Sequence, residues 1–195
     1  LFLMAAPAES FVLISEVLAD PASVGGDANK DGFVSSAGDE FVELYNASGE
    51  RVDLTGWSIH DAIAERHVFK MGSLLDPWST VVVFGGSPVL FTDPSWYAAS
   101  SGGLSLNNTG DAVRLFDPHR TLIDEFRFGA EGGKDVSLIR IHPRYDSQVA
   151  ASLGEAFSPG RTDYPLNMTV PEPATWSLFI MAFSLAGGCL RKSNS

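Results

Sequence analysis

Apolar and polar side chains alternate along the middle of the chain, in short runs separated by turns rich in Gly, Pro, Asn and Asp. The runs occupy residues 11–18, 40–45, 52–59, 80–84, 112–116, 122–128 and 136–141. Successive side chains of a β-strand point to opposite faces, so a period of two gives each run one apolar face for a core. About seven short strands of this kind are typical of a β-sandwich. We predict one all-β, antiparallel β-sandwich over residues 11–143, with Phe41, Trp57, Val82 and Leu115 among its buried positions.

The two ends of the chain differ from the middle. Residues 1–8 are apolar and end in a small-x-small pattern, typical of the remnant of a signal peptide; a buried first strand is the alternative. Residues 174–190 form a run without charge, followed at once by Arg191 and Lys192. The run is just long enough to cross a bilayer as one transmembrane helix, and the basic border disfavours a core helix. Because basic residues stay on the cytoplasmic side, we expect everything before the run to lie outside.

Two stretches lack the alternation. Residues 85–103 form a long connection, rich in Gly and Ser at both ends, that we interpret as a flexible loop and a plausible contact surface. Residues 144–169 gather Ser, Ala, Gly, Pro and Asp, and we interpret most of them as a spacer between the domain and the membrane. Phe157 is costly to leave in water, so we expect residues 156–160 to pack back on the edge of the sandwich.

The segment before the apolar run is Val170-Pro171-Glu172-Pro173. This order of a Pro-Glu-Pro element, an apolar span and a short basic end resembles the PEP-CTERM sorting signal of Gram-negative bacteria, over residues 170–195. The resemblance implies that an exosortase-type membrane protease recognises the Pro-Glu-Pro element and removes the helix. The two prolines oppose both helix and strand pairing, so they keep the element extended and accessible. The protein is then expected first as a precursor anchored in the inner membrane, and afterwards at the cell surface or in the extracellular matrix.

Five pieces of the middle region resemble the bacterial lamin tail domain in their order. They are residues 13–21, 39–46, 52–57, 104–117 and 137–140. The resemblance implies an immunoglobulin-like sandwich, in which Trp57 can fill the space between the sheets. Residues 85–103 depart from the pattern of that family.

Charge narrows the set of partners. The formal net charge is −11, and the only cysteine, Cys189, lies in the apolar tail. The domain therefore has no disulfide and no cysteine-based metal site. Its acidic surface repels phosphate backbones, which argues against direct nucleic-acid binding and leaves a divalent cation as the natural counter-ion.

The strongest local motif for such a cation begins at Asp27. The side chains of Asp27, Asn29 and Asp31, followed by Gly32, match the D-x-N-x-D-G start of a calcium loop. Oxygen atoms at alternate positions can converge on one hard cation, and the glycine permits the sharp turn that this requires. The carbonyl of Phe33 would supply a further oxygen. We therefore expect bound calcium, and the alternative is a solvated acidic turn.

The second half of the motif departs from the EF-hand. Position twelve is Gly38, so the usual closing carboxylate is missing, and Asp39 and Glu40 follow it. Either of these two can close the site from a different angle. Ser35 and Asp20 are further candidates for a contact.

Catalytic motifs are weaker than binding motifs. The four histidines, His60, His67, His119 and His142, are scattered along the sequence. No Gly-x-Ser-x-Gly nucleophile elbow occurs, and no paired-carboxylate or His-x-x-x-His spacing stands out. We predict a non-enzymatic, exported binding or scaffold module whose extracellular ligand is unknown, with a matrix polysaccharide or a protein as candidates. The first alternative is an accessory binding module that assists an envelope hydrolase or nuclease. The second is a hydrolase that uses the scattered histidines.

Overall fold

The computed structural model describes residues 11–86, 93–140, 149–151 and 155–161. All of them belong to the first of two units of the chain, Leu1–Tyr164, and the second unit is Pro165–Ser195. The predicted signal remnant and the predicted sorting tail, with its span at residues 174–190, lie outside the described residues. No helix within the described ranges is long and apolar enough to cross a membrane.

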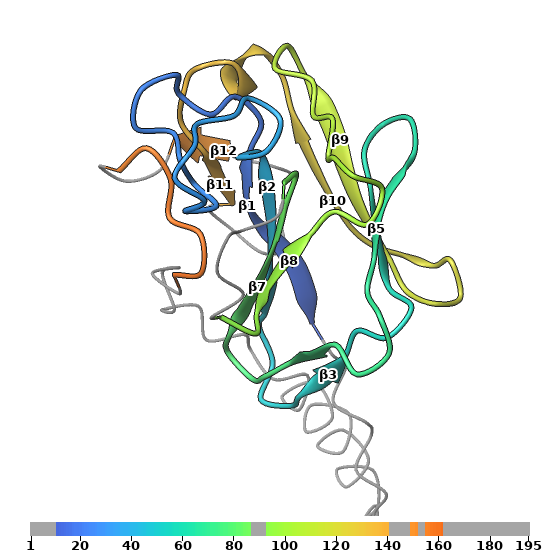
Figure 1. Cartoon of the computed structure of the whole chain (residues 1–195). Coiled ribbons are helices and arrows are strands. Elements are labelled where there is room, and N and C mark those ends of the chain that lie inside the picture. Colours follow the sequence, from blue (N-terminus) through green and yellow to red (C-terminus); the bar gives the residue numbers. More distant parts are fainter. Residues whose placement is uncertain (1–10, 87–92, 141–148, 152–154, 162–195) are drawn as a thin grey trace, which may run out of the picture. The chain divides into compact units, whose positions relative to one another are not determined.

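Short strands and turns make up the described part of the chain (Figure 1). The strands are β1 (Val12–Leu18), β2 (Phe41–Asn46), β3 (Val52–Asp53), β4 (Ser58–His60), β5 (Glu65–Val68), β6 (Leu74–Leu75), β7 (Thr80–Phe84), β8 (Trp96–Ala98), β9 (Asp111–Phe116), β10 (Leu122–Phe128), β11 (Leu138–Arg140) and β12 (Val149–Ala151). One 3-10 turn, η1 (Ala130–Gly132), follows β10. The prediction of an all-β, immunoglobulin-like sandwich domain is confirmed for the described residues.

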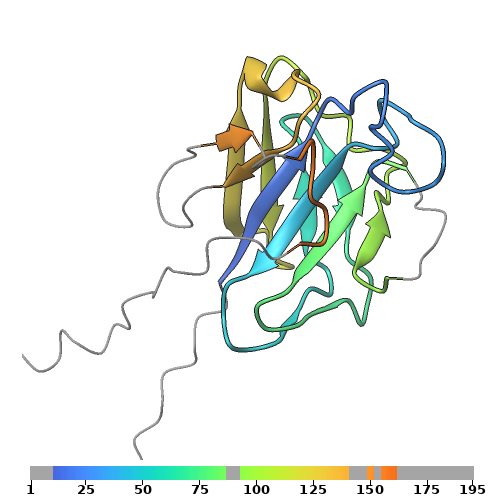
Figure 2. The same ribbon diagram turned by 90° about the vertical axis from the view of Figure 1, so that its left-hand side faces the viewer.

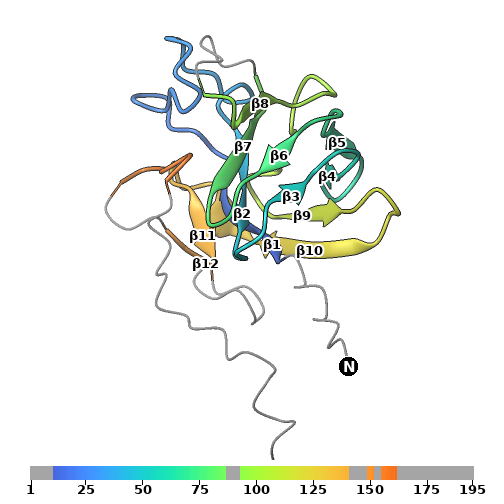
Figure 3. The same cartoon turned by 90° about the horizontal axis from the view of Figure 1, so that it is seen from below.

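Two sheets form the layers of the sandwich. One has the order β12-β11-β1-β2-β7-β8, and the other has the order β10-β9-β4-β5. The short pair β3-β6 lies at one end, where Figure 3 shows it between the two layers. β7 and β8 run parallel, with Val82 opposite Trp96, so the expectation of a purely antiparallel sandwich is wrong at this edge. Parallel neighbours cannot be joined by a two-residue hairpin, and here eleven residues separate the end of β7 from the start of β8.

Both faces of the six-stranded sheet are buried. Its inner face, with Leu44 and Val83, packs against Leu115 and Phe126 of the other sheet, and Trp57 joins this core with 7% of its surface exposed. A second cluster covers the opposite, outer face. It contains Leu18, Ala28, Phe41, Val82 and Phe84, with Trp96 and Phe157 packed against it.

The four positions predicted to be buried, Phe41, Trp57, Val82 and Leu115, are confirmed. Phe41 and Val82 belong to the outer cluster, whereas the other two belong to the core between the sheets. Phe41 and Val82 are buried on the outer face because other segments of the chain fold over that face.

One of these segments is residues 155–161, here called the strap. It crosses the outer face of β1 and β2, as the orange ribbon of Figure 2 shows. Phe157 packs on the outer cluster, which confirms the prediction that this residue folds back on the sandwich. The backbone N–H of Ser137, just before β11, donates a hydrogen bond to the carbonyl of Ala156 at 2.7 Å. β12 also lies within residues 144–169, which the sequence analysis assigns mostly to a spacer.

The run at residues 52–59 is not one strand. It divides into β3 and β4, which belong to different sheets. Gly56 adopts φ +77°, a left-handed conformation that glycine tolerates best, and the chain turns there. The N–H of Thr55 donates to Asp53 Oδ1 at 2.8 Å and helps to close the turn. The expectation of a continuous strand is therefore corrected.

Candidate functional site

The loop between β1 and β2 carries the candidate calcium ligands, and their own side chains close its turn. Asp27 Oδ1 accepts a hydrogen bond from the N–H of Asp31 at 3.0 Å, and Asn29 Oδ1 accepts from the same N–H at 2.9 Å. Asp31 Oδ1 in turn accepts from the N–H of Phe33 at 2.8 Å. The structure therefore brings Asp27, Asn29 and Asp31 together around one turn.

The two acidic residues at the end of the loop point in different directions. Asp39 is fully buried, and it accepts the N–H of Asn29 at 3.1 Å and the N–H of Ser35 at 2.7 Å. It thus ties the start of the loop to its end. Glu40 instead accepts the N–H of Leu106 through Oε2 at 3.3 Å. Burial raises the pKa of Glu40 to about 7, although this N–H opposes the shift.

Asp20 and Ser35, the two further candidates for a contact with the cation, each make a different hydrogen bond. Asp20 Oδ1 accepts a hydrogen bond from Asn108 Nδ2 at 2.6 Å, and Ser35 Oγ accepts one from the N–H of Gly38 at 3.0 Å. Among the described residues, no group of three or more His, Cys, Asp or Glu side chains is placed to hold a metal ion. The donors that do meet at the turn are all oxygen atoms, two carboxylates and one amide. Such a set suits a hard cation such as calcium rather than zinc or copper.

A second acidic group lies on the outer face of the six-stranded sheet, and the sequence analysis does not single it out. Glu16 on β1 and Glu43 on β2 are direct register partners, with 3% and 2% of their surface exposed. Burial, and next the charge of Glu16, raises the pKa of Glu43 to about 8. Burial also raises the pKa of Glu16, against the hydrogen bonds from Ser158, the nearby Ser137 hydroxyl and the charge of Arg161. Each glutamate looks like an ordinary outward polar position in its strand, so the sequence gives no local signal of their burial.

The histidines are not arranged as a catalytic relay. His60 Nε2 lies 3.1 Å from Ser58 Oγ and 3.6 Å from Glu65 Oε2. In a serine-nucleophile relay the hydroxyl and the carboxylate bind opposite nitrogens of the ring, whereas both approach Nε2 here. His67 is buried, and burial lowers its pKa to about 4, so the ring is neutral near pH 7. This geometry gives no support to the hydrolase alternative.

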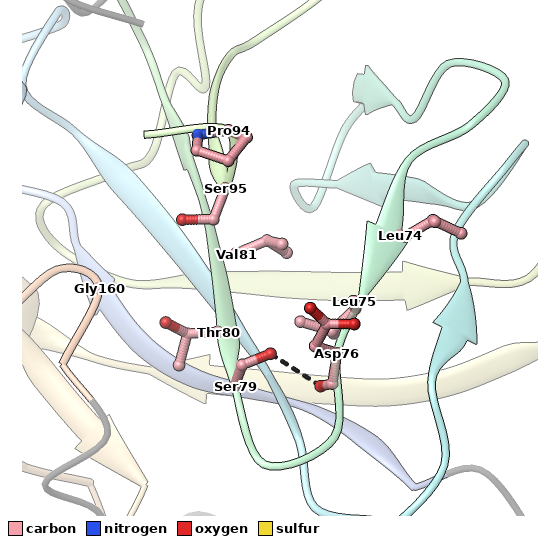
Figure 4. Close-up of a pocket in the computed structure, with 9 residues that line it drawn as sticks. All are labelled: Leu74, Leu75, Asp76, Ser79, Thr80, Val81, Pro94, Ser95 and Gly160. Atoms are coloured by element: carbon pink, nitrogen blue, oxygen red, sulfur yellow. Dashed lines mark hydrogen bonds between the residues drawn. The ribbon is translucent and has the colours of Figure 1, made fainter. Parts of the chain in front are cut away.

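A cleft of about 300 Å³ lies between the turn that precedes β7 and the start of β8 (Figure 4). It is lined by Leu74, Leu75, Asp76, Ser79, Thr80, Val81, Pro94, Ser95 and Gly160. Ser79 Oγ donates a hydrogen bond to the Asp76 carbonyl at 2.7 Å, and the Asp76 carboxylate pairs with Arg51.

Comparison with protein families gives two matches. The model of the Lamin Tail Domain matches residues 5–130, which is well over half of the chain and most of the sandwich. The model of the PEP-CTERM protein-sorting motif matches residues 169–193. This second match contains Val170-Pro171-Glu172-Pro173, Arg191 and Lys192, which lie outside the residues that the structure describes. Among curated proteins, none matches the chain.

Proposed function

The chain belongs to the lamin tail domain family, and we propose that it is a non-enzymatic module that binds or scaffolds material at the surface of the cell or in the extracellular matrix. The observation that carries this proposal is the order of the two family matches, with a sandwich at residues 5–130 and a sorting motif at residues 169–193. Both are non-catalytic types of domain. The sorting motif suggests an exported protein that an exosortase processes.

The proposed route assigns a role to each part of the tail. Residues 170–173 are the element that the exosortase-type protease recognises, because two prolines oppose helix and strand pairing and leave the backbone accessible. Residues 174–190 span the inner membrane of a Gram-negative bacterium until they are cleaved off. Arg191 and Lys192 hold the end of the span on the cytoplasmic side.

Mass spectrometry of surface protein tests this route. In a host with an exosortase we expect no peptide from Ala174 onward, whereas in a host without one the intact precursor should stay in the inner membrane. Glu172→Ala should cause the same retention in the competent host, and Glu50→Ala on the exposed face of the sandwich should not. An intact tail on mature surface protein contradicts the proposal.

We further propose that the turn after Asp27 binds one calcium ion through the side chains of Asp27, Asn29 and Asp31 and the carbonyl of Phe33. The convergence of three oxygen side chains on one turn supports this proposal. Asp39 is better placed than Glu40 to close the site, because it already receives the N–H of a candidate ligand. Carboxylates crowded on one turn repel each other without a cation, so calcium should order the loop.

Thermal melting with and without calcium tests the second proposal. An ion that binds only the folded state, at about one hundred times its dissociation constant, adds roughly 2.7 kcal/mol of stability. An extracellular site can be weak, with a dissociation constant of about 10⁻⁴–10⁻³ M. Magnesium should substitute poorly, since it prefers a tighter octahedral shell. The double variant Asp27→Ala, Asp31→Ala should lose the calcium-induced rise in melting temperature, while the exposed control Asp93→Ala should keep it. If calcium raises the melting temperature equally in both variants, the loop is only an acidic turn.

A further inference from the structure

The buried pair of Glu16 and Glu43 is covered by the strap, and the strap is held by hydrogen bonds to both carboxylates. The N–H and Oγ of Ser158 donate to Glu16 Oε1 and Oε2, each at 2.8 Å. The N–H of Gly160 donates to Glu43 Oε2 at 2.7 Å. On the sheet itself, Ser15 Oγ donates to Glu43 Oε1 at 2.7 Å. All four carboxylate oxygens thus accept a hydrogen bond, and three of these bonds come from the strap.

The charged side chains around Glu16 and Glu43 do not neutralise the two carboxylates. Arg161 of the strap acts on the pair from outside and lowers the pKa of Glu16. Arg161 also forms an ion pair with Glu155, and both of their side chains are at least half exposed. The hydroxyl groups of Ser15, Ser137 and Ser158 face the pair but carry no charge. Within the part of the chain that the structure describes, no buried cation therefore lies between these two carboxylates.

Directly opposed residues on neighbouring antiparallel strands have their Cβ atoms about 4.5–5.5 Å apart, and two carboxylates on such a pair cannot both be ionised at low cost in a dry site. We propose that the strap is a proton-dependent latch, in which one proton shared by Glu16 and Glu43 holds residues 155–161 on the sheet and loss of that proton releases them. With one proton present, the pair carries a single charge and still accepts the hydrogen bonds of the strap. With none, water must enter to solvate two charges, and the strap is what excludes it.

The direction of the pH dependence follows from the position of the proton. In the docked state the pKa of Glu43 is about 8, and in a released, hydrated state it returns to its usual value of 4.5. The docked state therefore holds the extra proton between these two pH values. The contribution of this proton to docking is fully present below pH 4.5. Between pH 4.5 and pH 8 the equilibrium constant for docking falls about tenfold per pH unit, and above pH 8 the contribution is lost.

Hydrogen exchange on the full chain in detergent micelles tests the latch. The readout is the protection of the Ser158 and Gly160 amides, corrected for the intrinsic rate of exchange, at about pH 5.5 and about pH 7.5. We expect protection to fall about 100-fold over these two pH units, since one proton gives tenfold per unit. The amides of β7, which has a paired strand on each side, should keep their protection, because the sandwich stays folded.

Variants separate the latch from other effects of pH. Glu43→Gln removes the charge but keeps an oxygen that can accept the Gly160 N–H, while its amide NH2 can donate to Ser15 Oγ, so the strap should stay docked at both pH values. Glu16→Gln provides an independent second variant if the first folds poorly, and the exposed Glu50→Gln is the matched control that should behave like the wild type. Equal protection at both pH values in the wild type overturns the proposal, as does an undiminished fall in both glutamine variants at the pair. Protection at pH 7.5 that calcium restores and a chelator removes would assign the pair to a metal ion, and would overturn the proton latch as well.

Discussion

Arg140 connects the two layers of the sandwich, and its removal should be among the most damaging single changes in the domain. It lies on β11 of the six-stranded sheet, and its Nη2 binds Asp124 Oδ2 on β10 of the other sheet at 2.8 Å. The same guanidinium donates to the carbonyls of Ile14 at 2.9 Å and Glu125 at 3.0 Å. The side chain is 6% exposed and that of Asp124 is 18% exposed, so this pair is largely shielded from water.

The magnitude follows from what Arg140→Met leaves behind. The methionine fills much of the volume, so the main loss is the charge and three hydrogen bonds, and Asp124 remains buried without its cation. Breaking a buried ion pair from one side costs about 3–5 kcal/mol. For a domain of this size that corresponds to a decrease in melting temperature of about 6–20 °C. Because burial already raises the pKa of Asp124, this carboxyl should take up a proton at low pH, and the loss should shrink there.

Urea unfolding followed by tryptophan fluorescence measures the change, with Arg51→Met as the matched control. Arg51 pairs with Asp76 on the surface, where both side chains are 59% exposed, so its loss should cost about 0–1 kcal/mol. Adding Asp124→Asn to Arg140→Met should recover part of the stability, because the asparagine still accepts the Ile14 N–H without a charge. A loss at Arg140 no larger than the loss at Arg51 would refute the reasoning.

Two further predictions concern the core. Trp57→Ala should cost about 3–5 kcal/mol in urea unfolding, because the ring fills the space between the sheets, whereas Trp78→Ala, which removes a half-exposed ring, should cost far less. Neither ring nitrogen of the buried His67 has a hydrogen-bond partner in the described part of the chain, and its pKa of about 4 lies below the usual 6.5. The unfolded chain therefore binds the extra proton between these values, so His67 should lower stability as pH falls from 6.5 to 4, and the difference between wild type and His67→Leu should narrow or vanish above pH 6.5.

Strong alternation locates strands well where it is supported by β-branched residues. The expected runs at residues 80–84 and 122–128 coincide with β7 and β10, and the run at 11–18 differs from β1 by one residue. β5, β6, β8 and β12 are missing from the sequence analysis. They have four residues or fewer and lie at sheet edges or in the small pair, where partners distant in the sequence decide the conformation.

Sites that depend on partners distant in the sequence are likewise missed, whereas local sites can be predicted. The turn after Asp27 is local, with its hydrogen bonds spanning two to five residues, so its spacing shows in the sequence. The burial of Glu16 depends on Ser158, which is 142 residues away. No window along the chain contains that information. Glu16 and Glu43 therefore appear in the sequence as the polar phase of two strands, although the fold makes them interior groups.

In the sequence the strap stands between the sandwich and the sorting element. Nine residues lead from Arg161 to Val170, and nine residues span at most about 30 Å when fully extended. Nineteen residues lead from Ala151, the end of β12, to Val170, and nineteen residues span at most about 65 Å, so under the proposed latch release of the strap would raise this upper limit. Two carboxylates on the sheet would thereby roughly double the distance over which a membrane protease can meet its cleavage site.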